Sequence, residues 1–286
     1  MKQQPDALAR ILEDLDDFIT RVLEEDVGTG DVTSNTVVPE DIIFHAAIAA
    51  REPLIVAGLP VAIGFIKRLA PDAEIDLCVE DGDFADTGTI LCRVKAPARA
   101  LLTAERPTLN ILQHMSGIAT LTREYVDAID GTGATLLDTR KTTPGLRMME
   151  KYAVTMGGAK NHRIGLFDGV LIKDNHVALA GGIAPTIARA RAGTDLLIEV
   201  ECDTLDQVRE AVEGGADMLL LDNMGPDKLR EAIALVDGRI PLEASGGINL
   251  QTIRPIAETG VDYISVGRVT QSAPAVDIGM DFEAAG

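Results

Sequence analysis

The sequence at residues 218–223 is Met218-Leu219-Leu220-Leu221-Asp222-Asn223, a short apolar run that ends in two polar residues. Five other runs between residues 134 and 268 share this pattern, and a helical stretch follows most of them. Their apolar parts are 134–137, 169–172, 196–198, 240–242 and 261–266. Short, continuously apolar strands that alternate with helices are typical of parallel sheets. The six strand–helix units therefore predict an α/β architecture with parallel strands.

Polar residues follow the apolar part of each of these six runs. In α/β barrels the active site lies at the carboxyl ends of the strands, so we expect the functional residues on that side. Because such a barrel usually has eight units, six units predict an incomplete, six-stranded parallel α/β barrel. The pattern alone leaves an open doubly wound sheet as the alternative.

The first part of the chain has a different pattern of apolar residues. Residues 6–26 carry apolar side chains at helical spacing, and residues 104–128 also indicate a helix. Between them, residues 42–50, 55–57 and 89–94 are rich in β-branched and small apolar residues, which predicts strands. Helices mixed with antiparallel strands predict an α+β arrangement ahead of the barrel.

Composition and charge argue against several classes of protein. The formal net charge of −19 disfavours nucleic acid or an anionic membrane as a partner. The first residues contain no apolar stretch typical of a secretory signal, and no run approaches the roughly 18 apolar residues of a membrane span. The three cysteines lack CxxC spacing, so neither a disulfide framework nor a zinc site is indicated. We expect a soluble, cytoplasmic protein.

The acidity of the chain has two interpretations. Asp and Glu number 45 against 26 Lys and Arg, and only 8 of the basic residues are Lys. This composition fits a protein that stays soluble at high salt, and it equally fits ordinary solubility through net charge. Activity measured up to molar salt distinguishes the two.

One segment departs from this acidity. Residues 140–173 contain seven Lys or Arg against two acids, a net charge of +5, so the remaining residues together carry −24. The basic residues are Arg140, Lys141, Arg147, Lys151, Lys160, Arg163 and Lys173. The segment is either a solvated helix face that balances acids elsewhere or a binding site for an anion.

The positions of these cations favour the anion site. Arg140 and Lys141 follow the first strand, Arg163 follows a glycine turn, and Lys173 follows the second strand. A guanidinium group holds a carboxylate or phosphate by two hydrogen bonds, and an ammonium group acts as a point charge. Each cation by itself would be an ordinary surface residue, but together they predict a substrate with several negative charges.

Four carboxylates lie on the next strands: Glu199, Glu201, Asp222 and Glu243. Glu199 and Glu201 are two residues apart, so they share one face of their strand. A carboxylate in a barrel mouth is costly to bury alone and needs a cation, a hydroxyl group or a metal. Ribose hydroxyls or a magnesium ion would satisfy this need, and the alternative is an ion pair with Lys141 or Lys173.

Glycines follow the last two strands, in Ser245-Gly246-Gly247-Ile248 and Ser265-Val266-Gly267-Arg268. At this place in a barrel, glycines let backbone N–H groups approach a phosphate closely. The residues alone therefore predict a basic wall, a carboxylate wall and a phosphate site, which suit a phosphorylated sugar and an acidic second substrate.

The ordered motifs resemble the quinolinate phosphoribosyltransferase family over nearly the whole chain. They begin with Glu25-Asp26-Val27-Gly28-Thr29-Gly30-Asp31-Val32-Thr33, Glu105-Arg106-Pro107-Thr108-Leu109-Asn110 and Ser116-Gly117-Ile118-Ala119-Thr120. They continue with Asp138-Thr139-Arg140-Lys141-Thr142-Thr143-Pro144-Gly145-Leu146-Arg147, Asn161-His162-Arg163 and Lys173-Asp174-Asn175-His176. The last are Leu221-Asp222-Asn223, Glu243-Ala244-Ser245-Gly246-Gly247 and Ser265-Val266-Gly267. So many motifs in one order make the resemblance highly specific.

The resemblance implies a fold and a reaction. It implies an N-terminal α/β sandwich domain at residues 1–112, joined by residues 270–286, and a partly open six-stranded α/β barrel at residues 113–269. Phosphoribosyl would be transferred from phosphoribosyl pyrophosphate to quinolinate with decarboxylation, giving nicotinate mononucleotide, with Mg²⁺ as cofactor. A homodimer or higher oligomer is implied, in which Arg106 reaches into the neighbouring subunit's site.

The resemblance also implies roles for individual residues. Those expected to carry catalysis are Lys141, Lys173, Glu201 and Asp222. Those expected to bind substrate alongside them are Arg106, Arg140, His162, Arg163, Ser245, Gly246, Gly247 and Gly267. Arg140, His162 and Arg163 would line the quinolinate pocket together with Lys141 and Lys173. Glu201 and Asp222 would face ribose and hold magnesium, and Glu201 is preferred to Glu199 because it matches the family's acidic position.

Three other functions stay open on the sequence. A related phosphoribosyltransferase would take nicotinate, which has one carboxylate, although the many cations favour quinolinate. A barrel aldolase would use Lys141 or Lys173 as a Schiff-base nucleophile. A non-catalytic relative would bind a small anion and do nothing further.

Overall fold

The computed structural model describes residues 7–282, which form two compact units. Unit 1 comprises residues 7–123, 148–158 and 273–282, and unit 2 comprises residues 124–147 and 159–272. Residue 6, the expected start of the first helix, lies outside the described residues. Within residues 7–282 no helix is long and apolar enough to cross a membrane. The domain limits expected from the sequence stay a prediction.

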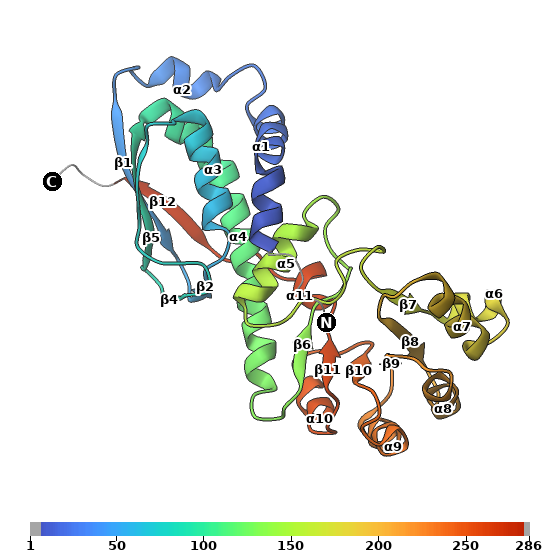
Figure 1. Cartoon of the computed structure of the whole chain (residues 1–286). Coiled ribbons are helices and arrows are strands. Elements are labelled where there is room, and N and C mark those ends of the chain that lie inside the picture. The colour runs from blue at the N-terminus through green and yellow to red at the C-terminus, as the bar shows by residue number, and fades with distance from the viewer. Residues whose placement is uncertain (1–6, 283–286) are drawn as a thin grey trace. The chain divides into compact units, whose positions relative to one another are not determined.

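Unit 1 is built on a four-stranded antiparallel sheet with the order β12-β1-β5-β3 (Figure 1). Its strands are β1 (Ile43–Ala50), β3 (Glu74–Leu77), β5 (Ile90–Pro97) and β12 (Ile278–Phe282). A second, two-stranded sheet pairs β2 (Leu54–Ile55) with β4 (Phe84–Ala85). Helices that belong wholly or partly to this unit are α1 (Ala7–Asp26), α2 (Val32–Val37), α3 (Leu59–Leu69), α4 (Ala98–Ala128) and α5 (Arg147–Met156).

The helices of unit 1 agree with the helical spacing of apolar residues in its sequence. The amphipathic segment expected at residues 6–26 is α1, whose buried Ile19 packs against α3. A Cβ added to Gly64 of α3 would lie 2.6 Å from Ile19 Cδ1, so this close packing requires glycine. The segment expected at residues 104–128 starts earlier, at Ala98, because the intervening Ala and Leu residues favour a helix.

Unit 2 contains six parallel strands in the order β6-β11-β10-β9-β8-β7 (Figure 1). These strands are β6 (Thr135–Leu137), β7 (Val170–Ile172), β8 (Ile198–Cys202), β9 (Met218–Asp222), β10 (Leu242–Ser245) and β11 (Tyr263–Ser265). Within residues 7–282 no ladder joins β6 to β7, so the sheet is open between its first and last strands. The predicted incomplete six-stranded parallel barrel is confirmed.

The positions of the helices in unit 2 distinguish a barrel from a doubly wound sheet. They are α6 (Asp174–Ala180), α7 (Ile183–Gly193), α8 (Leu205–Glu213), α9 (Pro226–Val236), α10 (Ile253–Ala257) and α11 (Arg268–Gln271). Helices α6 to α10 pack consecutively against one another, along one side of the sheet (Figure 1). A doubly wound sheet would carry helices on both faces. The apolar faces of α8 and α9 meet the buried side chains of β8 and β9, which form the core.

Two strands start and end later than their apolar runs, and three carboxylates lie within them. Strand β8 includes Glu199 and Glu201, and strand β10 includes Glu243, beyond the apolar runs at 196–198 and 240–242. The ladder to β9 explains the shift, because Glu199 pairs with Met218 and Glu201 with Leu220. Pairing with a neighbouring strand therefore extends each strand past its apolar part.

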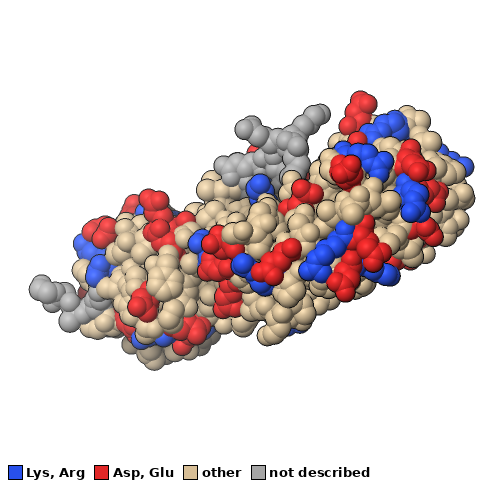
Figure 2. Space-filling model, turned by 90° about the horizontal axis from the view of Figure 1, so that it is seen from below, with Lys and Arg blue, Asp and Glu red and all other residues tan. Residues whose placement is uncertain are grey.

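The surface carries both signs of charge. Figure 2 shows Lys and Arg side chains interspersed among Asp and Glu on one face of the molecule. Within α8 and α9, Arg209 pairs with Asp206 and Arg230 with Asp227, each at 2.9 Å. These exposed pairs are one turn apart on their helices and contribute little to stability.

Candidate active site

The first strand of the barrel anchors a loop through one buried carboxylate. Asp138, directly after β6, is fully buried. Its carboxylate accepts hydrogen bonds of 2.8 Å from the Asn161 side chain and from the His162 backbone N–H. Residues 160–162 run beside the end of β6, because Lys160 forms a parallel bridge with Leu137. Asp138 was not among the predicted site residues, although its position at a strand end is a signal that could have identified it.

Arg147 links the two cationic loops of unit 2. Its Nε donates to Thr142 Oγ1 at 3.0 Å, and its Nη1 donates to the Ile164 carbonyl at 3.2 Å. The loop after β6 and the loop that carries Arg163 are therefore tied together. The sequence counted Arg147 only as part of the basic segment, because hydrogen bonds across loops leave no local pattern.

Arg140 and Arg163 are neighbouring cations in these loops. Arg163 Nη1 donates to the Gly169 carbonyl at 3.1 Å. Burial and the charge of Arg140 both lower the pKa of Arg163. Arg140 Nε is buried and has no hydrogen-bond partner among the described residues. An anion beside these guanidinium groups would satisfy the buried N–H of Arg140.

Lys141 lies against the loop after β11. Its backbone N–H donates to Thr139 Oγ1 at 3.0 Å, and its carbonyl accepts from Thr270 Oγ1 at 2.8 Å. A Cβ added to Gly267 would lie 2.8 Å from Lys141 Cδ. Because residue 267 is a glycine, the aliphatic part of the Lys141 side chain can pass close to its backbone.

Lys173, directly after β7, forms an ion pair with Glu201 on β8. This is the alternative that the sequence left open for the carboxylates, and the pair is only partly buried. Asp222, at the end of the next strand, accepts a hydrogen bond from the Asn223 side chain. Glu201 and Asp222 are thus half-buried carboxylates on neighbouring strands, accessible to a ligand.

The turn after β10 depends on glycine at one position. Gly246 has a φ of +94°, and a Cβ there would lie 2.3 Å from Asn223 Oδ1. At the next position, Gly247 has a φ of +62° and open space around it. Ser265 donates from Oγ to Ser245 Oγ at 2.9 Å, which joins the ends of β10 and β11. Glycine here lets backbone approach both Asn223 and a ligand.

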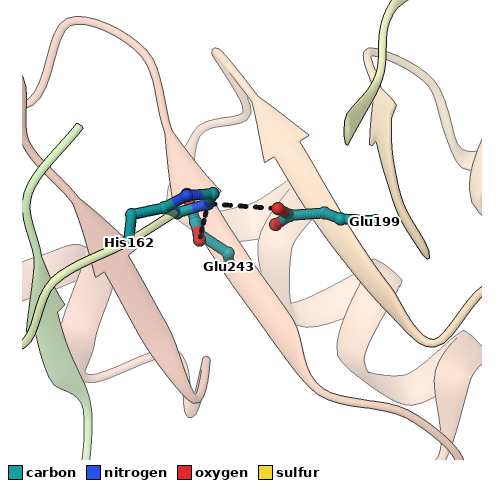
Figure 3. A group of neighbouring side chains, drawn as sticks. All are labelled: His162, Glu199 and Glu243. Carbon is teal, nitrogen blue, oxygen red and sulfur yellow. Dashed lines mark hydrogen bonds and ion pairs between the residues drawn. The ribbon is translucent and has the colours of Figure 1, made fainter. Parts of the chain in front are cut away.

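His162 lies between two buried carboxylates (Figure 3). Its Nε2 is 3.1 Å from Glu199 Oε2 and 3.3 Å from Glu243 Oε2. Its Nδ1 lies 2.7 Å from the Arg163 backbone nitrogen. The side chains of Glu199 and Glu243 are 4% and 0% exposed, against 13% for His162. Both ring nitrogens of His162 therefore have partners within the protein.

The surroundings of His162 and Glu199 favour the protonated form of each group. Burial by itself lowers the pKa of His162, but hydrogen bonds and charge from Glu199 and Glu243 more than offset it and raise this pKa to about 10. Burial and the charge of Glu243 raise the pKa of Glu199. The imidazole Nε2 lies between the two carboxylates and donates its proton to them.

Sequence comparison identifies the family. Residues 31–116 match the N-terminal domain and residues 118–281 the C-terminal domain of quinolinate phosphoribosyl transferase. The chain belongs to the quinolinate phosphoribosyltransferase family. A Bacillus subtilis (strain 168) relative, named probable nicotinate-nucleotide pyrophosphorylase (carboxylating), is 45% identical over 259 residues, covering 90% of this chain and 89% of the relative. A Mycobacterium leprae (strain TN) nicotinate-nucleotide pyrophosphorylase (carboxylating) is 43% identical over 272 residues, 93% of this chain and 96% of that one.

A solved structure agrees with this assignment to the quinolinate phosphoribosyltransferases. The nicotinate-nucleotide pyrophosphorylase from Francisella tularensis aligns with a TM-score of 0.92 at 38% identity, covering 95% of this chain and 96% of that chain. The family expected from the sequence motifs is confirmed, and so is the fold.

In this member of the quinolinate phosphoribosyltransferase family, unit 2 brings most of the expected site residues to the ends of its strands. They are Arg140, Lys141, His162, Arg163, Lys173, Glu201, Asp222, Ser245, Gly246, Gly247 and Gly267. Arg106 is part of unit 1, where it is an exposed residue of α4. The roles expected for all of these residues stay predictions.

Proposed function

We propose that this chain joins quinolinate to 5-phosphoribosyl 1-pyrophosphate and releases carbon dioxide and pyrophosphate, giving nicotinate mononucleotide for NAD biosynthesis. Relatives that are 43% and 45% identical carry the name of this enzyme, nicotinate-nucleotide pyrophosphorylase (carboxylating). The chain covers 89% and 96% of those relatives, so its likeness extends over both of their domains.

The observation that best supports the acidic substrate is the pair of guanidinium groups at Arg140 and Arg163. The Nε of Arg140 is buried and has no partner within residues 7–282. Burial, and next the charge of Arg140, lower the pKa of Arg163. Quinolinate carries two carboxylates, each able to accept two hydrogen bonds from a guanidinium group. A dicarboxylate would satisfy the buried N–H and remove the repulsion between the two cations.

The phosphoribosyl group fits the other half of the sheet. We assign ribose contacts to Glu201 and Asp222, which are half-buried at the ends of β8 and β9. Phosphate contacts are assigned to the glycine turns after β10 and β11, where backbone N–H groups approach closely. The residues of these turns are Ser245, Gly246, Gly247 and Gly267. Lys141 and Lys173 stand at the neighbouring strand ends and would attract the pyrophosphate.

A magnesium ion suits the same carboxylates. Mg²⁺ favours oxygen ligands and is usually held by one or two carboxylates together with substrate phosphates and waters. Glu201 and Asp222 supply two carboxylates on adjacent strands, which is the number that this mode of binding needs. When bound there, magnesium would neutralise part of the charge on the departing pyrophosphate.

The proposed reaction proceeds by charge stabilisation. Cleavage of the bond between C1 of ribose and pyrophosphate leaves a positive, oxocarbenium-like centre, which the Glu201 and Asp222 carboxylates stabilise. The quinolinate nitrogen donates its electron pair to C1 and becomes cationic. Loss of the C2 carboxylate as carbon dioxide then leaves an electron pair beside that cationic nitrogen, and C2 takes up a proton. This sequence needs no covalent enzyme intermediate.

We also propose an assembly and a location. The exposed position of Arg106 on α4 leaves its side chain available to a second copy of the chain. We assign the protein to homodimers, in which Arg106 enters the neighbouring site. The location that we propose is the cytoplasm, as expected from the sequence.

Release of both products tests the proposed reaction. Purified protein would be incubated with magnesium, phosphoribosyl pyrophosphate and either quinolinate or nicotinate, and carbon dioxide and pyrophosphate would be measured. We expect equal amounts of the two products with quinolinate and neither with nicotinate. Pyrophosphate alone, released with nicotinate, would indicate the related activity instead. No release with either acid would contradict catalysis altogether.

A further inference from the structure

Asn223, directly after β9, has a backbone conformation that residues with side chains rarely adopt. Its φ is +54°, and within residues 7–282 the other non-glycine residue in the left-handed region is Asp237, at +51°. Asparagine tolerates this conformation better than most residues, so the turn by itself would explain the residue type. The contacts of the Asn223 side chain, however, point to a second role.

This side chain lies between two parts of the proposed phosphoribosyl site. Its Nδ2 donates a hydrogen bond to Asp222 Oδ2. Its Oδ1 lies against Gly246, where an added Cβ would be 2.3 Å from that oxygen. Asp222 is the proposed ligand of ribose and magnesium, and Gly246 belongs to a turn to which we assigned phosphate. One amide group therefore contacts residues assigned to both parts of the substrate.

The backbone of Asn223 joins the two strands that carry these groups. Asp222 on β9 is the ladder partner of Ser245 on β10. The Asn223 N–H then donates to the Ser245 carbonyl at 2.9 Å. Because this bond comes from the backbone, a different side chain at residue 223 can keep it. The role of the amide can therefore be tested without removing the turn.

We propose that Asn223 is a positioning residue for phosphoribosyl pyrophosphate, whose amide orients the Asp222 carboxylate and packs on the turn at Gly246. This inference rests on the proposed function, because that function assigns ribose and magnesium to Asp222. The bond from Asn223 engages Oδ2 of Asp222, so Oδ1 is the oxygen that binds a ribose hydroxyl or a magnesium ion. Carboxylates that hold a metal are themselves usually held by hydrogen bonds from the protein.

Asp222 needs such a donor because its carboxylate group can otherwise rotate. The last torsion of an aspartate side chain is broadly populated, so packing alone fixes it poorly. Within residues 7–282 no other side chain donates to this carboxylate. The bond from Asn223 restricts the rotation before the substrate arrives, which lowers the cost of placing the substrate in its reactive geometry.

Asp237 shows the contacts of a residue that has only the conformational role. It ends α9 with a φ of 51° and a ψ of 45°, and its N–H donates to the Ile233 carbonyl at 2.9 Å. Its side chain is exposed and makes no hydrogen bond to any part of the chain between residues 7 and 282. Asn223 shares the backbone conformation of Asp237 and adds two side-chain contacts at the site.

Asn223→Gly tests the proposal, because glycine adopts a positive φ without steric cost and lacks the amide. Phosphoribosyl pyrophosphate would be titrated by calorimetry with magnesium and phthalate present. Phthalate carries the two carboxylates of quinolinate without the ring nitrogen, so it cannot react. We expect the dissociation constant of phosphoribosyl pyrophosphate to rise about 10- to 100-fold, as for other groups that orient a ligating side chain. That of phthalate should stay as in wild type. An unchanged dissociation constant for phosphoribosyl pyrophosphate would overturn the proposal.

The stability of the same variant separates positioning from a role in folding. Glycine relieves the strained backbone of the folded chain and also makes the unfolded chain more flexible, and these effects oppose each other. The denaturation midpoint of Asn223→Gly should therefore stay close to that of wild type. A clearly lower midpoint, with phthalate and phosphoribosyl pyrophosphate weakened equally, would assign Asn223 to folding and overturn the proposal.

Asn223→Asp tests the hydrogen bond itself. Aspartate has nearly the shape of asparagine and also tolerates the left-handed region. It cannot donate to Asp222 when ionised, and two neighbouring carboxylates disfavour each other's charge. We expect a loss of affinity for phosphoribosyl pyrophosphate at least as large as in Asn223→Gly. Affinity equal to that of wild type would contradict the assigned bond.

Asp237→Gly is the matched control, since it makes the same backbone change away from the proposed site. It should leave both dissociation constants unchanged. A loss of affinity equal to that of Asn223→Gly would show that the effect is not specific to the Asn223 amide, against the proposal.

The wild-type protein separates this inference from the proposed reaction. If it bound phosphoribosyl pyrophosphate but released no carbon dioxide with quinolinate, the proposed reaction would be wrong. The comparison of Asn223→Gly with wild type would still decide the positioning role. If wild type bound no phosphoribosyl pyrophosphate at all, both the proposed function and this inference would be contradicted.

Discussion

The antiparallel sheet of unit 1 and the parallel sheet of unit 2 both carry acidic residues, but they place them differently. In unit 1, Glu74 on β3 pairs with Lys95 on β5 at 2.7 Å, and their side chains are 72% and 43% exposed. In unit 2, Glu199 on β8 and Glu243 on β10 are almost completely buried, with one histidine between them. Both members of the Glu74–Lys95 pair contact water, whereas Glu199 and Glu243 contact protein atoms instead of water.

The cost of burying a charge helps to distinguish charged residues that bind ligands from those that only cover the surface. An exposed ion pair costs little to form and contributes little to stability. Buried carboxylates are costly, and replacing such groups with apolar residues is often neutral or stabilising. Charges held in the interior of a parallel sheet, such as Glu199 and Glu243, are therefore better explained by ligand binding than by folding. The following predictions test this contrast.

The largest effect is expected at Arg140. Arg140→Ala would remove one of the two guanidinium groups and leave a substrate carboxylate without its partner in a buried site. We expect kcat/KM for quinolinate to fall by roughly 2–5 kcal/mol in transition-state binding, or roughly 30- to 5,000-fold. Steady-state kinetics would measure this. Arg230→Ala, in an exposed pair of α9, serves as the control, and an equal kcat/KM for Arg140→Ala and wild type would remove Arg140 from the site.

An intermediate effect is expected at Gly246. In Gly246→Ala the new Cβ would meet Asn223 Oδ1 at 2.3 Å, and the residue would have to keep a φ of +94°. We expect a loss of about 1–3 kcal/mol in the free energy of unfolding from the backbone conformation. The clash should additionally raise the KM for phosphoribosyl pyrophosphate, because Asn223 adjoins Asp222.

Gly260 provides the matched control for this turn. It has nearly the same φ, +97°, but nothing within 4 Å of an added Cβ. Gly260→Ala should therefore share the backbone cost without the change in KM. Equal KM values for the two variants would show that the contact with Asn223 is irrelevant to binding. Chemical denaturation and kinetics on both variants give the comparison.

The smallest effect is expected in the exposed pair of unit 1. A hydrogen bond from Lys95, and then its charge, lower the pKa of Glu74. A lowered folded-state pKa contributes stability above the unfolded value, and this contribution is lost as the pH falls through the folded value. Lys95→Ala should therefore lower the melting temperature slightly at pH 7 and not at all at strongly acidic pH. A larger decrease at acidic pH would reverse the assigned sign.

The amino-acid sequence was sufficient for the architecture and the family. Parallel strands could be read from residues 218–221 and their counterparts because strands covered on both faces are apolar throughout, whatever their neighbours. The cationic loops were also evident, since charge is a property of composition. Strand ends were less certain: the ladders to β9 extend β8 and β10 past their apolar runs to include Glu199 and Glu243.

Only the tertiary structure decided which charges meet. His162 contacts Glu199, 37 residues away, and also Glu243, because the strand order places β8 and β10 on either side of β9. Lys173 meets Glu201 for a similar reason, since β7 pairs with β8. Such contacts depend on strand order, register and burial, which are set by the packing of the whole sheet. These contacts therefore cannot be predicted from a local stretch of sequence.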